Sequence, residues 1–220
     1  MLRNAGWGVV ILASAACLLG CRSRFEEIEI DLAERQQTSR PEPTRKPLRF
    51  GLAAMISPRE TVADYGALVR AIGTAIGVES ELVHGKSYKE VNERLADGRI
   101  DMAFLCTGGY LELATRTSVV VLAVPRVAGR TTYRSLIVVR DGDRAKSLFD
   151  LHRRRFAFTD PLSLSGYLYP ASRLHAAGRH VESFFASSEF VGSHDRAIQA
   201  VQRRVVDGAA VDSLVFERIR

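Results

Sequence analysis

Hydroxyl side chains and a glycine crowd the segment 159–170, which reads Thr-Asp-Pro-Leu-Ser-Leu-Ser-Gly-Tyr-Leu-Tyr-Pro. The segment follows an apolar run and precedes a helical pattern, so it is predicted to join the end of a strand to a helix. The first turn of a helix carries free backbone N–H groups and a partial positive charge, which favour a bound anion. Ser163 and Ser165 are therefore candidate donors to a phosphate-like or carboxylate group, and Gly166 is expected to let the ligand approach the backbone.

Other chemistry at this segment has weaker support. The same serines are equally consistent with a plain helix N-cap that binds no ligand. A serine hydrolase would combine Ser163 or Ser165 with His194 and Asp212, but the nucleophile spacing Gly-x-Ser-x-Gly is absent around both serines. The histidines are scattered, with no pair at metal-ligand spacing, and no Gly-x-x-x-x-Gly-Lys phosphate loop occurs. The sequence thus predicts no metal, no cofactor and no ATPase.

Residues 1–20 have the pattern of an export signal. Arg3 precedes an uncharged apolar run, and Leu18-Leu19-Gly20-Cys21 has the order of a bacterial lipobox. Lipidation of Cys21 would make it the first mature residue and would anchor the chain to a membrane, in the periplasm or at the cell surface. An ordinary signal peptide or a short membrane anchor is the alternative, although a run this short spans a bilayer poorly.

Residues 21–47 predict a flexible tether, because they are charged and polar and end in Arg40–Pro47, where three prolines oppose regular structure. Beyond Cys21 the mature chain has one further cysteine, Cys106, so no internal disulfide framework is expected.

Basic residues exceed acidic ones, giving a formal charge of +6. The clusters are Arg40–Arg49, His152–Arg155 and Arg203-Arg204. No aromatic interleaving or recognition motif accompanies them, so we interpret them as solvated surface that attracts anions and expect no nucleic-acid binding.

From Leu48 onward, short apolar runs alternate with amphipathic helical windows, a pattern typical of α/β units. The clearest helix starts with a capping box at Ser87 and Glu90 and stops at Asp97-Gly98. Pro170 is expected to make the first turn after Ser165 irregular. The expected strands are 48–55, 78–84, 100–106, 119–124, 133–139, 155–159, 188–191 and 209–214, and the expected helices are 60–76, 87–96, 109–114, 165–177 and 195–206.

A weak internal repeat accompanies this pattern. The order helix, Asp-Gly, strand, acidic residue occurs as Asp97-Gly98 with Asp101 and as Asp207-Gly208 with Asp212. The repeat would place these residues at equivalent positions in two similar lobes, 48–130 and 131–220. Asp-Gly is also a common stop between a helix and a strand.

Five short motifs occur in an order that resembles one family. They are Ser87-Tyr88-x-Glu90-Val91, Ile100-Asp101-x-Ala103-Phe104, Asp160-Pro161-x-Ser163-x-Ser165-Gly166-x-x-x-Pro170, Gly192-Ser193-His194 and Val211-Asp212. Their order and spacing resemble the phosphate/phosphite/phosphonate substrate-binding components of bacterial ABC transporters. The resemblance implies a type II periplasmic-binding fold, in which two α/β lobes close over a small ligand.

Carried over by position, the resemblance implies a site for a small oxyanion. Ser163 and Ser165 would donate to it, together with N–H groups of the helix at Gly166. Leu164, where the family often has Thr, would offer only its backbone N–H. The other residues implied at the site are Tyr88 and Tyr133 as phenolic donors, His194 as a further donor, and Asp212 near the non-anionic end of the ligand.

The resemblance also implies a role: capture of a phosphonate, phosphite or phosphate by hinge closure, without catalysis, for an ABC transporter permease. A ligand sensor for a membrane histidine kinase is the first alternative, and a serine hydrolase is the second. The chain ends at Arg220, directly after the strand expected to lead back to the first lobe. A truncated chain without the return crossover is therefore expected, and a truncated chain that no longer binds any ligand is the third alternative.

Overall fold

The computed structural model of the chain describes residues 46–56 and 58–219. The predicted leader, the predicted lipidation site Cys21 and all but the last two residues of the predicted tether lie outside the described residues. Among the residues described, no helix is long and apolar enough to cross a membrane.

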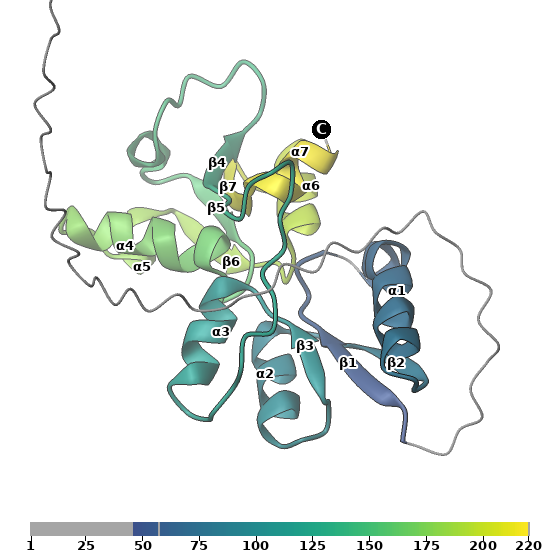
Figure 1. Cartoon of the computed structure of the whole chain (residues 1–220). Coiled ribbons are helices and arrows are strands. Elements are labelled where there is room, and N and C mark those ends of the chain that lie inside the picture. The colour runs from purple at the N-terminus through teal and green to yellow at the C-terminus, as the bar shows by residue number, and fades with distance from the viewer. Residues whose placement is uncertain (1–45, 57, 220) are drawn as a thin grey trace, which may run out of the picture. The chain divides into compact units, whose positions relative to one another are not determined.

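The first sheet is parallel and has the strand order β2-β1-β3. Its strands are β1 (Leu48–Leu52), β2 (Ser80–His84) and β3 (Met102–Phe104), and its helices are α1 (Pro58–Ala75), α2 (Tyr88–Ala96) and α3 (Thr107–Ala114). Figure 1 shows α1 on one side of this sheet and α2 and α3 on the other. The two faces have separate cores, since Phe50 and Leu52 pack with Val69 of α1, whereas Ala53 packs with Val91 of α2.

Helix α2 begins where its capping residues predict. The Ser87 hydroxyl accepts a hydrogen bond from the Glu90 backbone N–H at 3.1 Å. The Glu90 carboxylate accepts from the backbone N–H of Lys86 at 2.7 Å, one residue before the position that a standard capping box uses. Gly98 ends the helix region at a φ of 66°, which glycine adopts without steric cost.

The second sheet has the order β4-β7-β5-β6, with β4 antiparallel to β7 and the other neighbours parallel. Its strands are β4 (Ser135–Val139), β5 (Arg155–Phe158), β6 (Ser187–Phe190) and β7 (Gly208–Asp212). The helical elements are η1 (Leu148–Leu151), η2 (Leu164–Leu168), α4 (Tyr169–Ala176), α5 (Val181–Phe184), α6 (His194–Gln202) and α7 (Ser213–Ile219).

Both faces of the second sheet are covered. On one face, Phe156 and Phe158 pack with Leu174 of α4 and with Phe184 and Phe185. On the other face, the alternate residues of the strands, such as Ala157, Ala209 and Val211, pack with Ala197, Ile198 and Val201 of α6. Successive side chains of β5 and β7 point to opposite faces of the sheet, so each face has its own hydrophobic core.

The strand predicted at 119–124 is wrong for the described chain. This stretch forms no strand, and the exposed fractions of Val120, Leu122 and Val124 are 81%, 66% and 60%. Its β-branched residues favour extended backbone, but a strand also needs a neighbour to receive its hydrogen bonds, and no described segment pairs with it.

The weak repeat is also in a different register from the one predicted. Asp101 lies directly before β3, whereas Asp212 is the last residue of β7. The residue equivalent to Asp101 is instead Asp207, directly before β7. Two further boundaries differ: β1 ends at Leu52 rather than residue 55, and α7 begins at Ser213, inside the predicted strand 209–214.

Candidate functional site

The two sheets touch through the loops that follow their strands. The Tyr88 backbone N–H donates to the Asp160 carboxylate at 3.2 Å, and the His194 backbone N–H donates to the Met55 carbonyl at 3.0 Å. The Tyr133 hydroxyl donates to the Thr107 hydroxyl at 2.9 Å. Loops at the carboxyl ends of parallel strands are the usual place for ligands in α/β proteins.

Asp160 joins the serine segment to the first sheet. Its side chain is 4% exposed, and its carboxylate accepts hydrogen bonds from the backbone N–H groups of Tyr88 and of Leu162, the latter at 2.8 Å. The bond to Tyr88 satisfies a free N–H at the start of α2, a position that favours a carboxylate. Asp160 therefore caps a helix that belongs to the other sheet.

The serine segment enters its helix through a π-helical turn, η2, and then continues as α4 with Pro170 in the first turn. The irregular turn expected at Pro170 is therefore present. The Ser163 hydroxyl accepts from the Gly166 N–H at 3.0 Å, so Ser163 acts as the N-cap. That bond leaves its own proton free to donate. π-helical turns occur frequently at functional sites.

Ser165 and Gly166 lie in the interior. Ser165 is 3% exposed, its carbonyl accepts from the Ser135 hydroxyl at 2.6 Å, and its own hydroxyl makes no hydrogen bond to any described residue. A Cβ added at Gly166 would lie 2.5 Å from the Thr159 Cβ. Close packing against Thr159 is therefore sufficient to require glycine here.

Tyr88 is the largest fully buried side chain near the segment, with 1% exposure. Its hydroxyl is buried and has no well-formed hydrogen bond among residues 46–56 and 58–219. Burial raises the pKa of Tyr88 well above its usual value, and the nearby Ser163 side chain opposes this only weakly. A buried hydroxyl without a partner is costly, so it marks a position where a ligand acceptor would be stabilising.

His194 has a defined tautomer. Its Nδ1 accepts a hydrogen bond from the Asp212 backbone N–H at 3.1 Å, and the Thr159 hydroxyl lies 3.1 Å from the same atom. Nδ1 therefore carries no proton, and Nε2 bears the N–H. Burial lowers the pKa of His194 to about 4, so the ring is a neutral donor at neutral pH.

Asp212 and Tyr133 lie at the edge of the same region. The Asp212 carboxylate accepts from the Leu214 N–H at 2.7 Å, and burial raises its pKa. Burial likewise raises the pKa of Tyr133, and the Asp212 charge acts in the same direction. The two side chains are therefore close enough to influence each other electrostatically.

Cys106, Thr159 and Asp160 were missed as site residues. The Cys106 thiol donates to the Leu162 carbonyl at 3.6 Å, accepts from the Gly109 backbone N–H at 3.5 Å, and has a pKa raised by burial to about 12. It therefore stays protonated and packs beneath the serine segment. The position of Asp160, before a proline and after a predicted strand, could have indicated a functional residue. No sequence signal, however, predicts its hydrogen bond to Tyr88 beside the first sheet.

The structure brings most of the candidates together around the serine segment. The backbone N–H groups of Tyr88 and Ser163 both donate to Asp160, and the Ser165 carbonyl accepts from Ser135 at the start of β4. His194 contacts Thr159 and the Asp212 backbone N–H. Leu164 is the first residue of η2 and directly follows the Ser163 N-cap. Within the described residues, no group of three or more metal-ligating side chains occurs.

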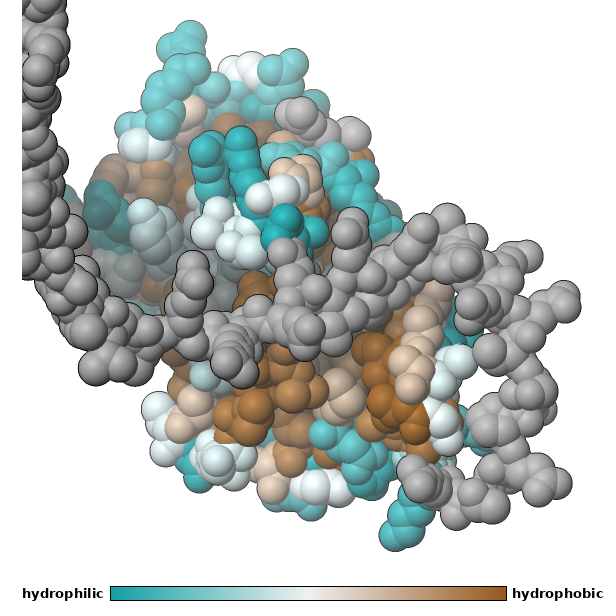
Figure 2. All heavy atoms as spheres, in the orientation of Figure 1, coloured by the Kyte–Doolittle hydropathy of each residue, from teal (hydrophilic) through white to brown (hydrophobic). Residues whose placement is uncertain are grey.

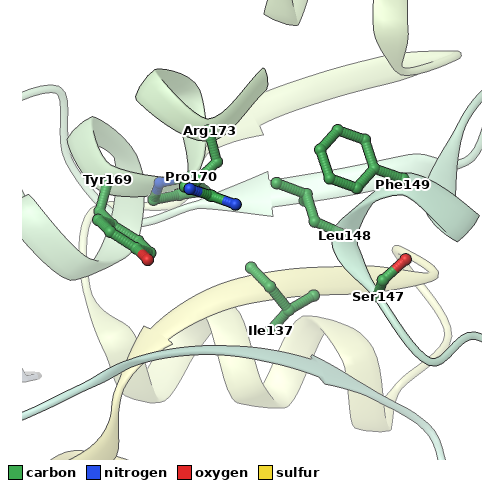
Figure 3. Close-up of a pocket in the computed structure, with 7 residues that line it drawn as sticks. All are labelled: Ile137, Ser147, Leu148, Phe149, Tyr169, Pro170 and Arg173. Carbon is green, nitrogen blue, oxygen red and sulfur yellow. The ribbon is translucent and has the colours of Figure 1, made fainter. Parts of the chain in front are cut away.

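A separate surface pocket of about 210 Å³ lies between β4, η1 and α4. Figure 3 shows Tyr169 and Arg173 on one side of it and Leu148 and Phe149 on the other. Its remaining lining residues are Ile137, Ser147 and Pro170. None of the candidate site residues lines this pocket.

Comparison with known sequences identifies a family. A family profile described as "ABC transporter, phosphonate, periplasmic substrate-binding protein" matches residues 50–220. The phosphate-import protein PhnD of Mycolicibacterium smegmatis is 27% identical over 164 residues, which is 70% of this chain and 51% of the relative. The chain thus spans about half the length of this relative.

Solved structures show the same fold. A binding-protein component of a phosphonate ABC transporter from Pseudomonas aeruginosa superposes with a TM-score of 0.71 at 20% identity, covering 80% of this chain and 60% of the other. PhnD1 of Prochlorococcus marinus, solved with methylphosphonate, gives a TM-score of 0.70 at 20% identity and coverages of 79% and 66%. The predicted type II periplasmic-binding fold is confirmed.

Proposed function

Because this chain belongs to the family of periplasmic substrate-binding components of phosphonate ABC transporters, we propose that it captures a small phosphonate-type oxyanion between its two sheets. The Ser163, Ser165 and Tyr88 hydroxyls are the main donors. The Tyr133 hydroxyl would join them once its hydrogen bond to Thr107 opens, and the His194 Nε2–H would be a further donor from behind Thr159. The observation that carries the proposal is the buried Tyr88 hydroxyl, which has no well-formed hydrogen bond although it faces the serine segment from the other sheet.

The charge of the site favours particular anions. The proposed donors are neutral, whereas Asp160 and Asp212 are carboxylates at the same place. These carboxylates would repel a dianion more strongly than a monoanion, and a ligand that carries its own ammonium group least. Among the phosphonate-type candidates, 2-aminoethylphosphonate is therefore favoured over methylphosphonate and phosphite, with its ammonium group placed toward Asp212. Phosphate, the cargo named for the mycobacterial relative, is the competing candidate.

Capture would proceed by closure of a lobe at 48–130 on a lobe at 131–220. Few hydrogen bonds join the two sheets, and each can break and reform as the lobes open and close. The ligand would replace water around the buried hydroxyls. The proposal also includes export of the chain and lipidation of Cys21, which would anchor the protein to a membrane. The bound ligand would then be delivered to an ABC transporter permease.

A hydrolase is disfavoured by the hydrogen bond at His194. In a catalytic triad the Asp carboxylate accepts the Nδ1–H, which leaves Nε2 free to take a proton from serine. Here the Asp212 backbone N–H donates to Nδ1, so Nε2 already carries its proton.

Transport and sensing share the same binding step, because a protein that delivers its ligand to a permease and one that presents it to a histidine kinase must both first bind the ligand. A membrane histidine kinase that is activated by the liganded protein would favour the sensing alternative.

The first test uses the mature chain with Cys21→Ser, which carries no lipid. Its thermal unfolding is followed with phosphite, phosphate, methylphosphonate, 2-aminoethylphosphonate and sulfate, because a ligand of the folded state raises the apparent melting temperature. A response to a phosphonate or phosphite supports the proposal. A protein that melts cooperatively and responds to none of these anions contradicts it.

Tyr88→Phe separates binding from packing. The variant removes a buried hydroxyl that lacks a well-formed hydrogen bond, so its free energy of unfolding should equal or exceed that of the wild type, by up to about 1 kcal/mol. Its anion affinity, measured by calorimetry, should fall at least tenfold. Tyr169→Phe, at a 50% exposed position, is the control and should change neither. Unchanged affinity in Tyr88→Phe would remove this residue from the site.

Ser165→Ala gives a second test, since its hydroxyl bonds to no described residue and its loss should leave stability nearly unchanged. Ser163→Ala also loses the cap on Gly166, which is worth about 1 kcal/mol. Combining both substitutions should abolish anion binding while the protein still folds. Retained binding in the double variant would contradict the assignment of the serines.

A further inference from the structure

Two arginine clusters that lie about fifty residues apart in the sequence meet in the fold. His152–Arg155 leads into β5 and Arg203-Arg204 leads into β7, and these strands are parallel neighbours. The end of β4 lies beside them, because Val139 pairs with Gly208 in the antiparallel register. We call residues 140–155 and 203–207 the basic end of the second sheet.

Contacts across this end hold its parts together. The Asp207 backbone N–H donates to the Arg155 carbonyl at 2.9 Å, and an Arg140 guanidinium nitrogen donates to the Val206 carbonyl at 3.4 Å. The Arg153 backbone N–H donates to the Phe184 carbonyl at 2.8 Å. The charged residues are therefore displayed on a fixed support of strand ends.

The basic end has a clear excess of positive charge, with eight Arg or Lys residues against four Asp residues. Two of the carboxylates are used in ion pairs, Asp143 with Arg154 and Asp207 with Arg155, both at 2.8 Å. Asp150 accepts from the N–H groups of the turn before η1. The exposed cations that make no ion pair with any described residue are Arg144, Lys146, Arg153, Arg203 and Arg204.

Apolar side chains lie among these cations. Phe149 is 43% exposed and Val205 is 52% exposed. Figure 2 shows mainly hydrophilic residues at the upper end, where the loop after β4 lies in Figure 1. Long cations interleaved with a few exposed apolar groups suit the interface of a bilayer, where headgroups are charged and the adjoining layer is apolar.

We propose that the basic end binds the anionic headgroups of a lipid bilayer and fixes the orientation of the domain on the membrane surface. The proposal goes beyond ligand capture and needs neither the ligand nor the lipid on Cys21. The serine segment follows the carboxyl ends of the strands, whereas the basic end lies at the opposite ends of β5 and β7. A domain held by the basic end would leave the ligand site facing away from the headgroups, the orientation for collecting ligand, and would have to release the headgroups before it delivers the ligand to a permease.

The test is co-sedimentation of the mature Cys21→Ser protein with vesicles of phosphatidylcholine alone and of phosphatidylcholine with one third phosphatidylglycerol. Binding should require phosphatidylglycerol and should fall steeply between 0.1 and 0.5 M NaCl, because surface charge is screened over about a Debye length. Arg144→Glu with Arg203→Glu should reduce the bound fraction at least tenfold. Binding that is equal on both vesicles, or absent from both, would contradict the proposal.

Matched variants exclude a general effect of net charge. Arg130→Glu with Lys89→Glu changes the charge equally at exposed positions outside the basic end and should retain binding. Arg153→Asn with Arg204→Asn removes two charges at positions where φ is 56° and 62°, a conformation that asparagine tolerates well. This variant should fold normally yet bind the vesicles less. Equal losses in the control and test pairs would overturn the assignment to the basic end.

The same proteins are mixed with double-stranded DNA at the same salt concentrations. Binding to DNA that is as tight as binding to the vesicles, and equally sensitive to Arg144→Glu with Arg203→Glu, would show a general polyanion surface and would overturn the lipid assignment. Much weaker binding to DNA supports it.

Discussion

Each of the two sheets contains the same Arg–Asp contact between neighbouring strands, and the contact has the same register in both. In the first sheet, Arg49 of β1 donates to the Asp101 carboxylate from its backbone N–H at 2.8 Å and from its guanidinium at 2.9 and 3.1 Å. In the second, Arg155 of β5 makes the equivalent three bonds to Asp207 at 3.1, 2.8 and 3.1 Å. Each Arg precedes a buried Phe, and each Asp directly precedes the neighbouring strand.

The sheets differ in what surrounds this shared contact. The second sheet has four strands and an aromatic core in which Phe158 contacts four other rings. The first has three strands, its Phe50 contacts no ring among the described residues, and the apolar stretch 119–124 follows it without a strand partner. A shared local contact therefore does not make the two sheets equally stable, and we expect the second to depend more on its core.

The largest difference should come from the core. Phe158→Ala should destabilise the protein by about 4 kcal/mol, and Phe50→Ala by about 3, because Phe158 also loses aromatic pairs. Urea unfolding followed by circular dichroism measures both. Tyr169→Ala, at a 50% exposed position without a ring contact among the described residues, is the control and should cost about 1 kcal/mol or less. A larger loss from Phe50→Ala would reverse the comparison.

The next effect concerns the contact between the sheets. A Cβ at Gly108 would lie 2.1 Å from the Leu162 carbonyl oxygen, which is backbone and cannot move aside alone. Gly108→Ala should therefore cost about 2 kcal/mol and should weaken anion binding. At neighbouring Gly109 the nearest atom would be 3.5 Å away, so Gly109→Ala should be neutral or stabilise helix α3 by up to about 1 kcal/mol. Similar melting temperatures for the two variants would contradict this account.

A smaller effect is expected at the ionic contacts. The Arg side chains hold the pKa values of Asp101 and Asp207 below their usual value of 3.8. Their stabilisation is present above the unfolded pKa and is lost as the pH falls through the folded pKa. Asp101→Asn and Asp207→Asn should each cost about 0.5 kcal/mol at pH 7, since the pairs are partly exposed, and progressively less as the pH falls through the lowered pKa values. Stability measured from pH 7 to pH 2.5 tests this, and a cost that does not decrease toward low pH would exclude the ionic explanation.

The smallest effect on stability should come from the stretch without a partner. Val120→Lys with Leu122→Lys should change the free energy of unfolding by less than about 0.5 kcal/mol, because both side chains are already exposed. The variant should nevertheless aggregate less, since an exposed apolar edge promotes association. Light scattering at increasing protein concentration measures this. A large loss of stability would mean that these side chains pack against the fold.

The elements could be predicted wherever a local signal determined them. The Ser87 cap, the Asp97-Gly98 stop and the alternation along β5 depend on near neighbours in the sequence, and the predicted helix and strands are present there. The stretch 119–124 was mispredicted because a strand depends on a partner, which a local pattern cannot reveal. The register of the repeat was missed for a similar reason, since Arg49 and Arg155 lie some fifty residues from the carboxylates they bind.

The site was predicted only in part. The serine segment was recognised from its residue types and its place between a strand and a helix. The Asp160 bond to Tyr88 spans seventy-two residues, and the tautomer of His194 depends on the backbone N–H of Asp212. Neither contact can be predicted from a local sequence pattern. Ligand binding by the individual side chains stays a prediction.

The strand order of the second sheet has a consequence for how the chain folds. β7 lies between β4 and β5, yet it is the last of the described strands along the chain. The first sheet needs only residues up to Phe104, so it can form early, whereas β4 has no hydrogen-bonded neighbour until Asp212 is available. Long-range pairing of this kind slows folding and leaves strand edges exposed meanwhile. Among the described parts of the chain, the second sheet is therefore the one whose strand edges stay exposed longer during folding.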